Sequence, residues 1–188
     1  MKNKVVFLVL ILCLVFSGNV YAGSIKSAKL EKCVDGDTAR FIIKDREYST
    51  RFLAINTPEL KHGSRKEEPY AKKASNYTCN KLRQAKKIVL EYDPNSDKED
   101  KYGRKLAWIF VDGKLLQEEL VEKGYAEVKY LYGDYKYTDS LKIAQLKAKS
   151  KKLNIWSDKK TSDLEDEVID NILDKIYKYI RKEIKSML

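Results

Sequence analysis

Acidic and arginine side chains recur in three short parts of this chain, at residues 35–37, 51–59 and 100–104. These are the side-chain types that hydrolysis of a phosphodiester bond requires. Asp35 and Asp37 flank a glycine, and two such carboxylates repel each other unless a cation lies between them. Arg51 and Arg104 supply planar, permanently charged guanidinium groups that bind phosphate in a bidentate manner. Glu59 follows a proline, whose fixed φ restricts the backbone. These residue types suggest a site that holds a divalent metal ion and a phosphate.

A simpler interpretation of Asp35-Gly36-Asp37-Thr38 is a turn in which one aspartate bonds to its own backbone, and this segment by itself favours the turn. The chain has one histidine, His62, which is too few for a Ser-His-Asp hydrolase or a His-rich zinc site. We expect His62 to be solvated and not a ligand. Any hydrolysis must therefore depend on carboxylates, cations and a metal ion.

The size and charge of the chain narrow its class. Its 188 residues suffice for one main domain with appendages. Lys and Arg number 38 against 28 Asp and Glu, a formal net charge of +10. This excess favours anionic partners such as nucleic acid or acidic membrane surfaces, and charge alone does not choose between them.

The N-terminus has the pattern of a secretory signal peptide. Lys2 and Lys4 precede an apolar run over residues 5–16, and Ala22 suits a cleavage site. A membrane anchor is the competing interpretation, but this run is shorter than the roughly 20 residues that a spanning helix needs. We predict removal of residues 1–22, a secreted or periplasmic protein, and no stable membrane insertion afterwards. Loss of two lysines and no acids leaves a formal charge of +8.

Cleavage also removes Cys13 and leaves Cys33 and Cys79. An even pair in an oxidising compartment makes one disulfide feasible. Two separately buried thiols are an equally good interpretation of the sequence.

Hydrophobic periodicity predicts an α+β domain. Short β-rich runs broken by turn residues predict roughly five strands, and apolar residues at helical spacing predict three helices. This order of elements indicates a five-stranded oligonucleotide-binding (OB-fold) β-barrel with helices packed outside it. The predicted strands lie in 24–34, 38–55, 89–92 and 106–111, and the predicted helices in 69–87, 115–123 and 138–151.

The composition changes after Trp156. Residues 162–186 carry an apolar stripe at four-residue spacing, with acids in the first half and bases in the second, as a helix macrodipole favours. The apolar face of this amphipathic helix must be covered, and docking on the barrel or self-association ranks above membrane binding. We divide the chain into a signal peptide (1–22), a barrel domain (24–158) and a C-terminal helical extension (160–188).

Seven segments resemble, in order and at compatible spacing, the staphylococcal nuclease (thermonuclease) family over about residues 28–157. Single triplets would be weak evidence, whereas the ordered set is specific. The segments are Val34-Asp35-Gly36-Asp37-Thr38, Arg51-Phe52-Leu53, Thr57-Pro58-Glu59 with Lys61-His62, Ala85-Lys86-Lys87-Ile88, Asp100-Lys101-Tyr102-Gly103-Arg104, Tyr130-Leu131-Tyr132 and Lys152-Leu153-Asn154-Ile155-Trp156.

The resemblance implies an extracytoplasmic, calcium-dependent endonuclease that cuts DNA and RNA with little sequence preference. By position, Asp37, Asn56 and the carbonyl of Thr57 would ligate the calcium ion, with Asp35 in support. The family usually has aspartate where this chain has Asn56. An amide oxygen coordinates calcium without bringing charge, which predicts weaker metal binding unless the substrate phosphate supplies the missing negative charge. Other divalent ions also accept oxygen donors of this kind.

The resemblance also implies roles for substrate residues. Glu59 would position or deprotonate the attacking water, and Arg51 and Arg104 would clamp the phosphate. Tyrosine faces suit sequence-tolerant stacking of bases. The positions that line the nucleotide pocket in the family correspond to Lys101, Tyr102, Tyr130 and Tyr132.

Two other functions compete with the nuclease. A nucleic-acid-binding module on the same barrel would retain the fold and lose activity, although here the acidic and arginine positions remain. A surface or adhesion protein that works through its C-terminal helix has no specific signal in the sequence.

Overall fold

The structure is a computed structural model that describes residues 24–64 and 66–158. The predicted signal peptide (1–22) and the predicted C-terminal helical extension (160–188) lie outside the described residues. None of the helices in the described part of the chain has the length and apolar character needed to cross a membrane.

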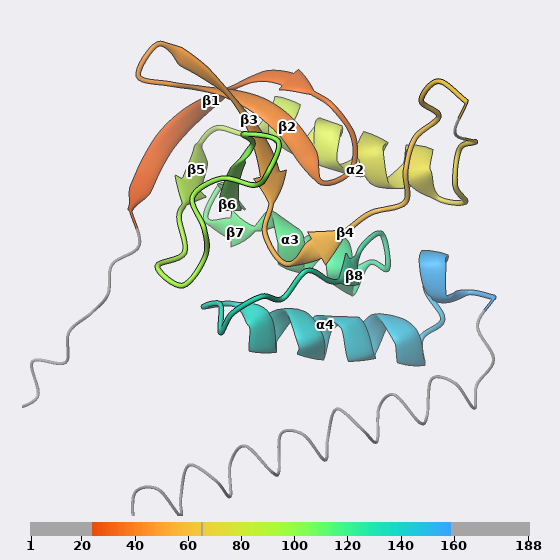
Figure 1. Ribbon diagram of the computed structural model, residues 1–188. Helices are drawn as coiled ribbons and strands as arrows, with labels where there is room; N and C mark the ends of the chain where they lie inside the picture. Colours follow the sequence, from red (N-terminus) through yellow and green to blue (C-terminus); the bar gives the residue numbers. More distant parts are fainter. Residues whose placement is uncertain (1–23, 65, 159–188) are drawn as a thin grey trace, which may run out of the picture.

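Five strands form a closed barrel, as the sequence predicts (Figure 1). They pair in the order β3-β2-β1-β5-β6, and a parallel pairing of β3 with β6 closes the sheet. Three two-residue strands, β4 (Ile55–Asn56), β7 (Lys114–Leu115) and β8 (Glu127–Val128), lie at its margins. The bounds of the barrel strands are Ile25–Cys33 (β1), Thr38–Ile43 (β2), Arg46–Phe52 (β3), Ile88–Glu91 (β5) and Lys105–Val111 (β6).

The β2–β3 hairpin sets the register of the barrel. In β2 the buried side chains of Ala39, Phe41 and Ile43 alternate with less buried ones, because successive side chains of a strand point to opposite faces. Lys44 and Asp45 form the two-residue turn, both with positive φ, as tight hairpins of this kind require. The resulting register places Thr38 opposite Arg51 at the far end of the hairpin.

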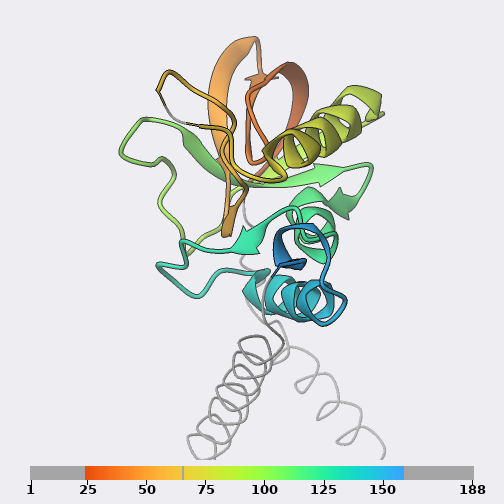
Figure 2. The same cartoon turned by 90° about the vertical axis from the view of Figure 1, so that its right-hand side faces the viewer.

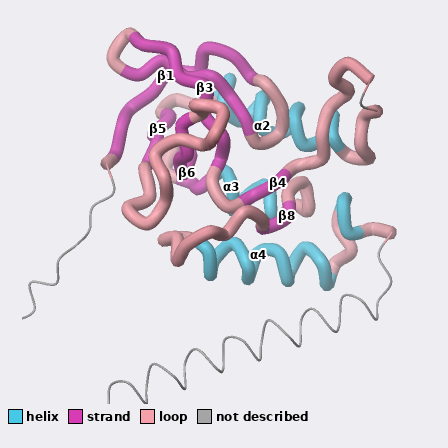
Figure 3. The backbone as a smooth tube through the Cα atoms, viewed as in Figure 1, coloured by secondary structure: helices cyan, strands magenta, loops and turns pink. Residues whose placement is uncertain are grey.

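In the described part of the chain, three α-helices lie outside the barrel (Figures 2 and 3). They are α2 (Ala71–Gln84), α3 (Leu116–Glu122) and α4 (Thr138–Ser150), and a short 3₁₀ turn, η1 (Asn154–Trp156), follows α4. The sequence predicted all three helices, but it placed the start of α2 at Pro69. The helix begins two residues later because Tyr70 has a left-handed backbone, with φ of 69°.

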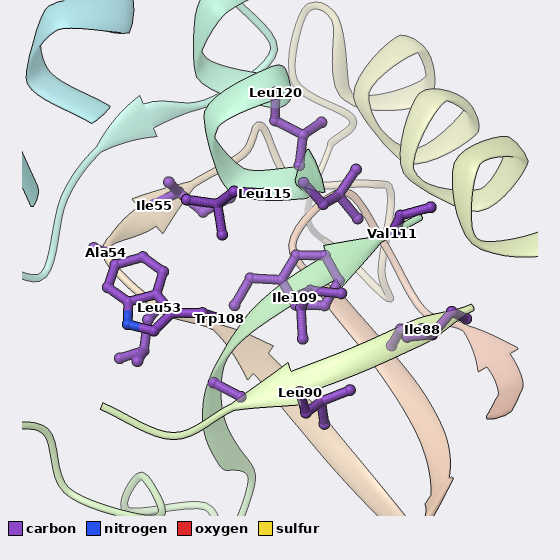
Figure 4. Packing of buried hydrophobic residues seen from close by; sticks show 14 of the residues in the cluster. Leu53, Ala54, Ile55, Ile88, Leu90, Trp108, Ile109, Val111, Leu115 and Leu120 are labelled. Atoms are coloured by element: carbon purple, nitrogen blue, oxygen red, sulfur yellow. The ribbon is translucent and has the colours of Figure 1, made fainter. Parts of the chain in front are cut away.

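The core lies between the barrel and α3 (Figure 4). Leu90 of β5, Trp108 and Ile109 of β6 and Leu120 of α3 are all fully buried. The indole N–H of Trp108 donates to the carboxylate of Asp93 at 2.8 Å, which satisfies the polar atom of an otherwise apolar side chain. The core therefore fixes the ends of β5 and β6.

Cys33 and Cys79 form a disulfide, with their Cα atoms 5.7 Å apart, so the structure selects one of the two interpretations that the sequence left open. The bridge joins the end of β1 to α2, across a sequence separation of 46 residues. It lies two residues before Asp35, and it therefore ties the first acidic segment to a helix.

Replacing both cysteines, Cys33→Ser with Cys79→Ser, should lower the free energy of unfolding by about 2–4 kcal/mol, because the unfolded chain regains the freedom that the bridge removes. Urea denaturation of the purified protein measures this change. Dithiothreitol should destabilise the wild type by a similar amount and leave the double variant unchanged. Equal midpoints for the oxidised wild type and the double variant would contradict the prediction.

Candidate active site

Asp37 is the centre of the candidate site. Its residue is 5% exposed, and its carboxylate accepts hydrogen bonds from three neighbouring groups. The backbone N–H of Thr57 donates to Oδ2 at 2.8 Å, the hydroxyl of Thr57 at 3.1 Å, and the hydroxyl of Thr38 to Oδ1 at 3.1 Å. Because a buried charge is costly unless it is paired and hydrogen-bonded, these contacts hold the start of β2 against the segment after β4.

Arg51 neutralises this carboxylate and links it to Asn56. Its Nη2 atom lies 3.0 Å from Oδ2 of Asp37 and donates to Oδ1 of Asn56 at 3.3 Å. Its Nη1 atom donates to the backbone carbonyl of Phe52 at 3.2 Å. One nitrogen of a cation thus lies between the two side-chain oxygens that the sequence assigned to a metal ion.

A glycine allows these segments to meet. A Cβ atom at Gly36 would lie 2.6 Å from the hydroxyl of Thr57, so any other residue would push the two segments apart. The carbonyl of Gly36 accepts a hydrogen bond from the hydroxyl of Thr78 at 2.6 Å. Thr78 precedes the disulfide-bonded Cys79, and α2 therefore holds the acidic turn through two adjacent residues.

Asp35 has an unusual electrostatic environment. Burial raises its pKa to about 6, and the negative charge of Asp37 acts in the same direction. The backbone N–H of Asp37, which donates to Oδ1 of Asp35 at 3.0 Å, and the charge of Arg51 offset part of this effect. The bond from the N–H of Asp37 closes the backbone-bonded turn that the sequence favoured for this segment. Asp35 thus forms this turn and also lies beside Asp37.

Glu59 lies at the exposed side of this site. Its backbone N–H donates to the carboxylate of Glu68 at 2.9 Å, and its carbonyl accepts from the N–H of Glu68 at 3.0 Å. Its charge contributes to the raised pKa of Asp35, which indicates that Glu59 lies close to the acidic turn. The segment that carries Glu59 leads to α2 on the right of Figure 1.

Arg104 is held by Asp100, four residues earlier. Its Nε and Nη2 atoms lie 2.7 and 2.6 Å from Oδ2 of Asp100. Burial would raise the pKa of Asp100, but hydrogen bonds from the backbone and side chain of Arg104 and from the N–H of Tyr102 keep that pKa below its usual value. Two guanidinium nitrogens thus share one carboxylate oxygen, and the other oxygen accepts from the backbone N–H of Arg104, so the direction of the guanidinium is fixed.

The barrel register brings the two arginines to neighbouring strands. Arg51 pairs with Leu106 in the parallel β3–β6 ladder, and Arg104 lies two residues before Leu106. Adjacent strands are about 4.8 Å apart, so the backbones of the two arginine segments run side by side. Each guanidinium is held by its own aspartate, Arg51 by Asp37 and Arg104 by Asp100.

Aromatic side chains flank both arginines. The guanidinium of Arg51 lies 5.7 Å from the ring centre of Tyr130, and that of Arg104 lies 5.5 Å from the ring centre of Tyr102. The ammonium of Lys101 lies 5.1 Å from the same Tyr102 ring. Tyr102 is 71% exposed and Tyr132 is 83% exposed. The ring centres of Tyr130 and Tyr132 lie 6.4 Å apart. Exposed rings beside guanidinium groups are suited to stacking on bases.

The donor atoms of the site suit a hard divalent ion, although they are not a cluster of carboxylates. Among residues 24–64 and 66–158, no three His, Cys, Asp or Glu side chains gather as a metal centre. The candidate donors are instead a carboxylate, an amide oxygen and a carbonyl, from Asp37, Asn56 and Thr57. Because Arg51 already places a cationic nitrogen between Asp37 and Asn56, these oxygens favour positive charge at that point.

Sequence reasoning missed several residues that support the site. Glu127 pairs with Asn56 across β4 and β8, and its carboxylate accepts from Nδ2 of Asn56 at 3.4 Å. No local signal identifies Glu127, because the contact spans 71 positions of the chain. Asp100 begins the segment that the sequence compared with the family, but its ion pair with Arg104 across the turn was not predicted. The sequence also gave no role to Thr38, which donates to Asp37, or to Glu68, which accepts from the N–H of Glu59.

A closed five-stranded barrel with packed helices and an acidic, arginine-flanked surface defines an oligonucleotide-binding fold of the nuclease type. A family model described as "Staphylococcal nuclease homologue" matches residues 49–158. The thermonuclease of Staphylococcus hyicus is 33% identical over 129 residues, which cover 69% of this chain and 75% of that protein. The chain belongs to the staphylococcal nuclease family, which confirms the resemblance predicted from the sequence.

Two proteins of Bacillus subtilis (strain 168) are also similar. Endonuclease YncB is 40% identical over 129 residues, which cover 68% of this chain and 60% of that protein. The SPbeta prophage-derived endonuclease YokF is 42% identical over 129 residues, which cover 68% of this chain and 43% of that protein. The chain thus spans less than two thirds of the length of either relative.

Replacing Asp35 with asparagine should stabilise the metal-free protein above pH 7 by about 1–3 kcal/mol. The raised pKa means that the folded state binds a proton more tightly than the unfolded state, so the charged carboxylate destabilises the fold at pH values above about 6. Asparagine removes this cost and retains an oxygen for the N–H of Asp37. The difference should shrink as the pH falls through about 4 and disappear near pH 3, where Asp35 is protonated in both states.

Urea denaturation in chelator across this pH range measures the difference, with the exposed Asp97→Asn as the matched control. A variant that is less stable than the wild type at pH 8 would show that the charge of Asp35 does not destabilise the metal-free fold.

Proposed function

We propose that this protein is a secreted, calcium-dependent endonuclease that hydrolyses phosphodiester bonds of DNA and RNA with little sequence preference. The observation that carries the proposal is a linked set of contacts around Asp37. Its carboxylate contacts both Thr57 and Arg51, and Arg51 also donates to Asn56. The family membership supports it, because relatives named as endonucleases and thermonucleases share most of this domain. The net positive charge suits a polyanionic substrate.

The calcium ion would be held by the Asp37 carboxylate, the Asn56 amide oxygen and the Thr57 carbonyl, with Asp35 as a nearby second charge. When bound, the ion would supply charge neutralisation and polarisation at a phosphoryl oxygen. Asp37 is already aligned by its hydrogen bonds from Thr57 and Thr38. A carboxylate that is fixed in advance needs little reorganisation when it takes up a cation.

The remaining chemistry belongs to side chains of the chain itself. Glu59 would accept a proton from a water molecule as that water attacks phosphorus. Arg51 and Arg104 would donate hydrogen bonds to the non-bridging oxygens, on which negative charge grows during in-line displacement. Lys101, Tyr102, Tyr130 and Tyr132 would hold the nucleotide next to the cleaved bond, through charge and through stacking on bases.

The disulfide supports an extracytoplasmic location, because such bridges persist in oxidising compartments. The proposal includes removal of residues 1–22.

The proposal also includes self-association through residues 162–186. Light scattering over a concentration series tests the self-association, and a monomer throughout would exclude it.

Replacing Glu59 with glutamine should lower kcat by about 10²–10⁴-fold, because the amide cannot accept the proton. Arg104→Lys should lower it by about 10²–10³-fold, because lysine retains the charge and loses the planar fork. Cleavage of denatured DNA and of RNA, with calcium or with chelator, provides the measurement. Arg83→Lys on the exposed side of α2 is the matched control, and circular dichroism verifies folding.

Full activity of the folded Glu59→Gln protein would exclude Glu59 as the proton acceptor. If the wild type binds nucleic acid and cleaves it with none of the divalent ions, the chain is instead a binding module on the nuclease fold.

Changing Asn56 to aspartate should tighten calcium binding roughly tenfold, because a carboxylate brings charge to the site. In the calcium-free protein, Glu127 would repel the new carboxylate and Arg51 would attract it, because both lie next to this position. Calorimetric titration with calcium measures the affinity. Asn76→Asp on the exposed face of α2 adds the same charge and should leave the affinity unchanged. An unchanged affinity in the Asn56→Asp variant would show that Asn56 does not contact the ion.

A further inference from the structure

A basic hollow of about 600 Å³ lies at one open end of the barrel, away from the Asp37 site. It is bounded by the start of β1, the β2–β3 turn, the end of β5 and the start of β6. In Figure 1 the start of β1, the tip of the β2–β3 hairpin and the loop after β5 all lie on the left. Five of its lining residues are cationic, namely Lys26, Lys44, Arg46, Lys98 and Lys105.

We propose that this hollow is a second phosphate-binding subsite, which holds the backbone of a single nucleic-acid strand several nucleotides from the bond that is cut. The inference rests on the proposed nuclease function and adds to it a preference for longer substrates. The proposed ligand is the phosphodiester backbone and not a particular base sequence, because cationic side chains read charge and not sequence.

The charge of the hollow is largely uncompensated. Within residues 24–64 and 66–158, Lys26, Lys44, Arg46 and Lys98 form no ion pair, and only Lys105 pairs with an acid, Glu99. Of the other acids close in sequence to these cations, Glu47 pairs with Arg40, and Asp45 and Asp97 are exposed beside Lys44, Arg46 and Lys98. None of these acids lines the hollow. A concave surface with excess positive charge concentrates anions.

Two tyrosines also line the hollow, together with Ser24 and Ile43. Tyr48 of β3 and Tyr92 after β5 are both partly buried, and the ammonium of Lys105 lies 5.3 Å from the ring centre of Tyr48. Aromatic faces next to cations are the usual composition of surfaces that bind single strands without sequence preference.

The backbone around the hollow is fixed by hydrogen bonds. The N–H of Tyr92 donates to the carbonyl of Ser24 at 3.1 Å, and the N–H of Leu106 donates to the carbonyl of Lys98 at 3.1 Å. Lys105 lies within β6, paired with Thr50. The cations therefore project from strands and pinned loops, so binding would not have to order the backbone first.

The barrel connects the hollow to the candidate active site. Arg46 and Arg51 occupy opposite ends of β3, about 17 Å apart at the usual rise of an extended strand. Arg104 directly precedes Lys105, so one segment contributes to both sites. At about 3.4 Å per nucleotide, as in one strand of duplex DNA, this separation corresponds to roughly five nucleotides, and a more extended single strand spans it with fewer. A substrate of that length is long enough to occupy both sites.

The test compares long and short substrates. The variant Lys44→Ala/Arg46→Ala/Lys98→Ala removes three unpaired cations of the hollow. The matched control is Arg83→Ala/Lys86→Ala/Lys87→Ala, which removes three exposed cations near the opposite end of β5. The full mature chain is assayed with calcium on a single-stranded DNA 12-mer and on a trinucleotide, and binding of the 12-mer is measured by fluorescence anisotropy in chelator.

The hollow variant should raise KM for the 12-mer about tenfold or more and leave kcat/KM for the trinucleotide within about twofold of the wild type. The slope of log affinity against log salt for the 12-mer should fall by about 2, because each lost phosphate contact removes about 0.7. The control variant should leave KM for the 12-mer, kcat/KM for the trinucleotide and the salt slope close to their wild-type values, apart from a small general effect of charge.

Equal effects of the hollow variant on both substrates, no effect on either, or an equal effect of the control variant would overturn the inference. Binding to vesicles of anionic phospholipid provides a further comparison. Loss of vesicle binding with unchanged 12-mer binding would assign the hollow to a membrane surface and also overturn it. A wild type that neither binds nor cleaves the 12-mer would refute the proposed function itself, whereas normal cleavage with no length effect refutes only the subsite.

Discussion

The buried carboxylate of Asp37 is the constraint on which the rest of the site depends. A charge at 5% exposure would destabilise the fold without partners, and here it has hydrogen bonds from Thr38 and Thr57 and an ion pair with Arg51. These partners come from β2, from the segment after β4 and from β3, so satisfying one carboxylate brings three segments to one place. Gly36 permits the approach, because a larger residue would collide with Thr57.

The barrel closure and two unusual backbone positions set the rest of the geometry. Parallel pairing of β3 with β6 carries Arg104 toward the Arg51 strand. Ala54 has φ of 61°, which turns the chain from β3 into β4, and its carbonyl accepts the N–H of Lys129 at 3.0 Å. Tyr130, which follows, has φ of 60° and lies against Arg51. Positive φ is costly for residues other than glycine, and here it accompanies the placement of an aromatic ring beside Arg51.

Positive charge is distributed over two parts of the barrel with different surroundings. Around Asp37, each arginine is held by an aspartate, which fixes its direction. At the opposite end of β3, most of the cations that surround the hollow have no acidic partner within the described residues. Fixed guanidinium groups suit the recognition of one phosphate with defined geometry, whereas unpaired cations suit tolerant attraction of a polyanion. The same small fold accommodates both, because β3 and the segment before β6 extend from one region to the other.

The sequence by itself determined the elements and the chemical groups. Alternating apolar residues predicted the barrel strands, helical spacing predicted α2, α3 and α4, and ordered local motifs identified the family, because these signals depend on near neighbours in the chain. Tertiary structure alone decided that Cys33 meets Cys79, that Glu127 contacts Asn56 across 71 positions, and that one nitrogen of Arg51 lies between Asp37 and Asn56. Such contacts follow from strand register and barrel closure, which depend on how distant segments pack and leave no local pattern.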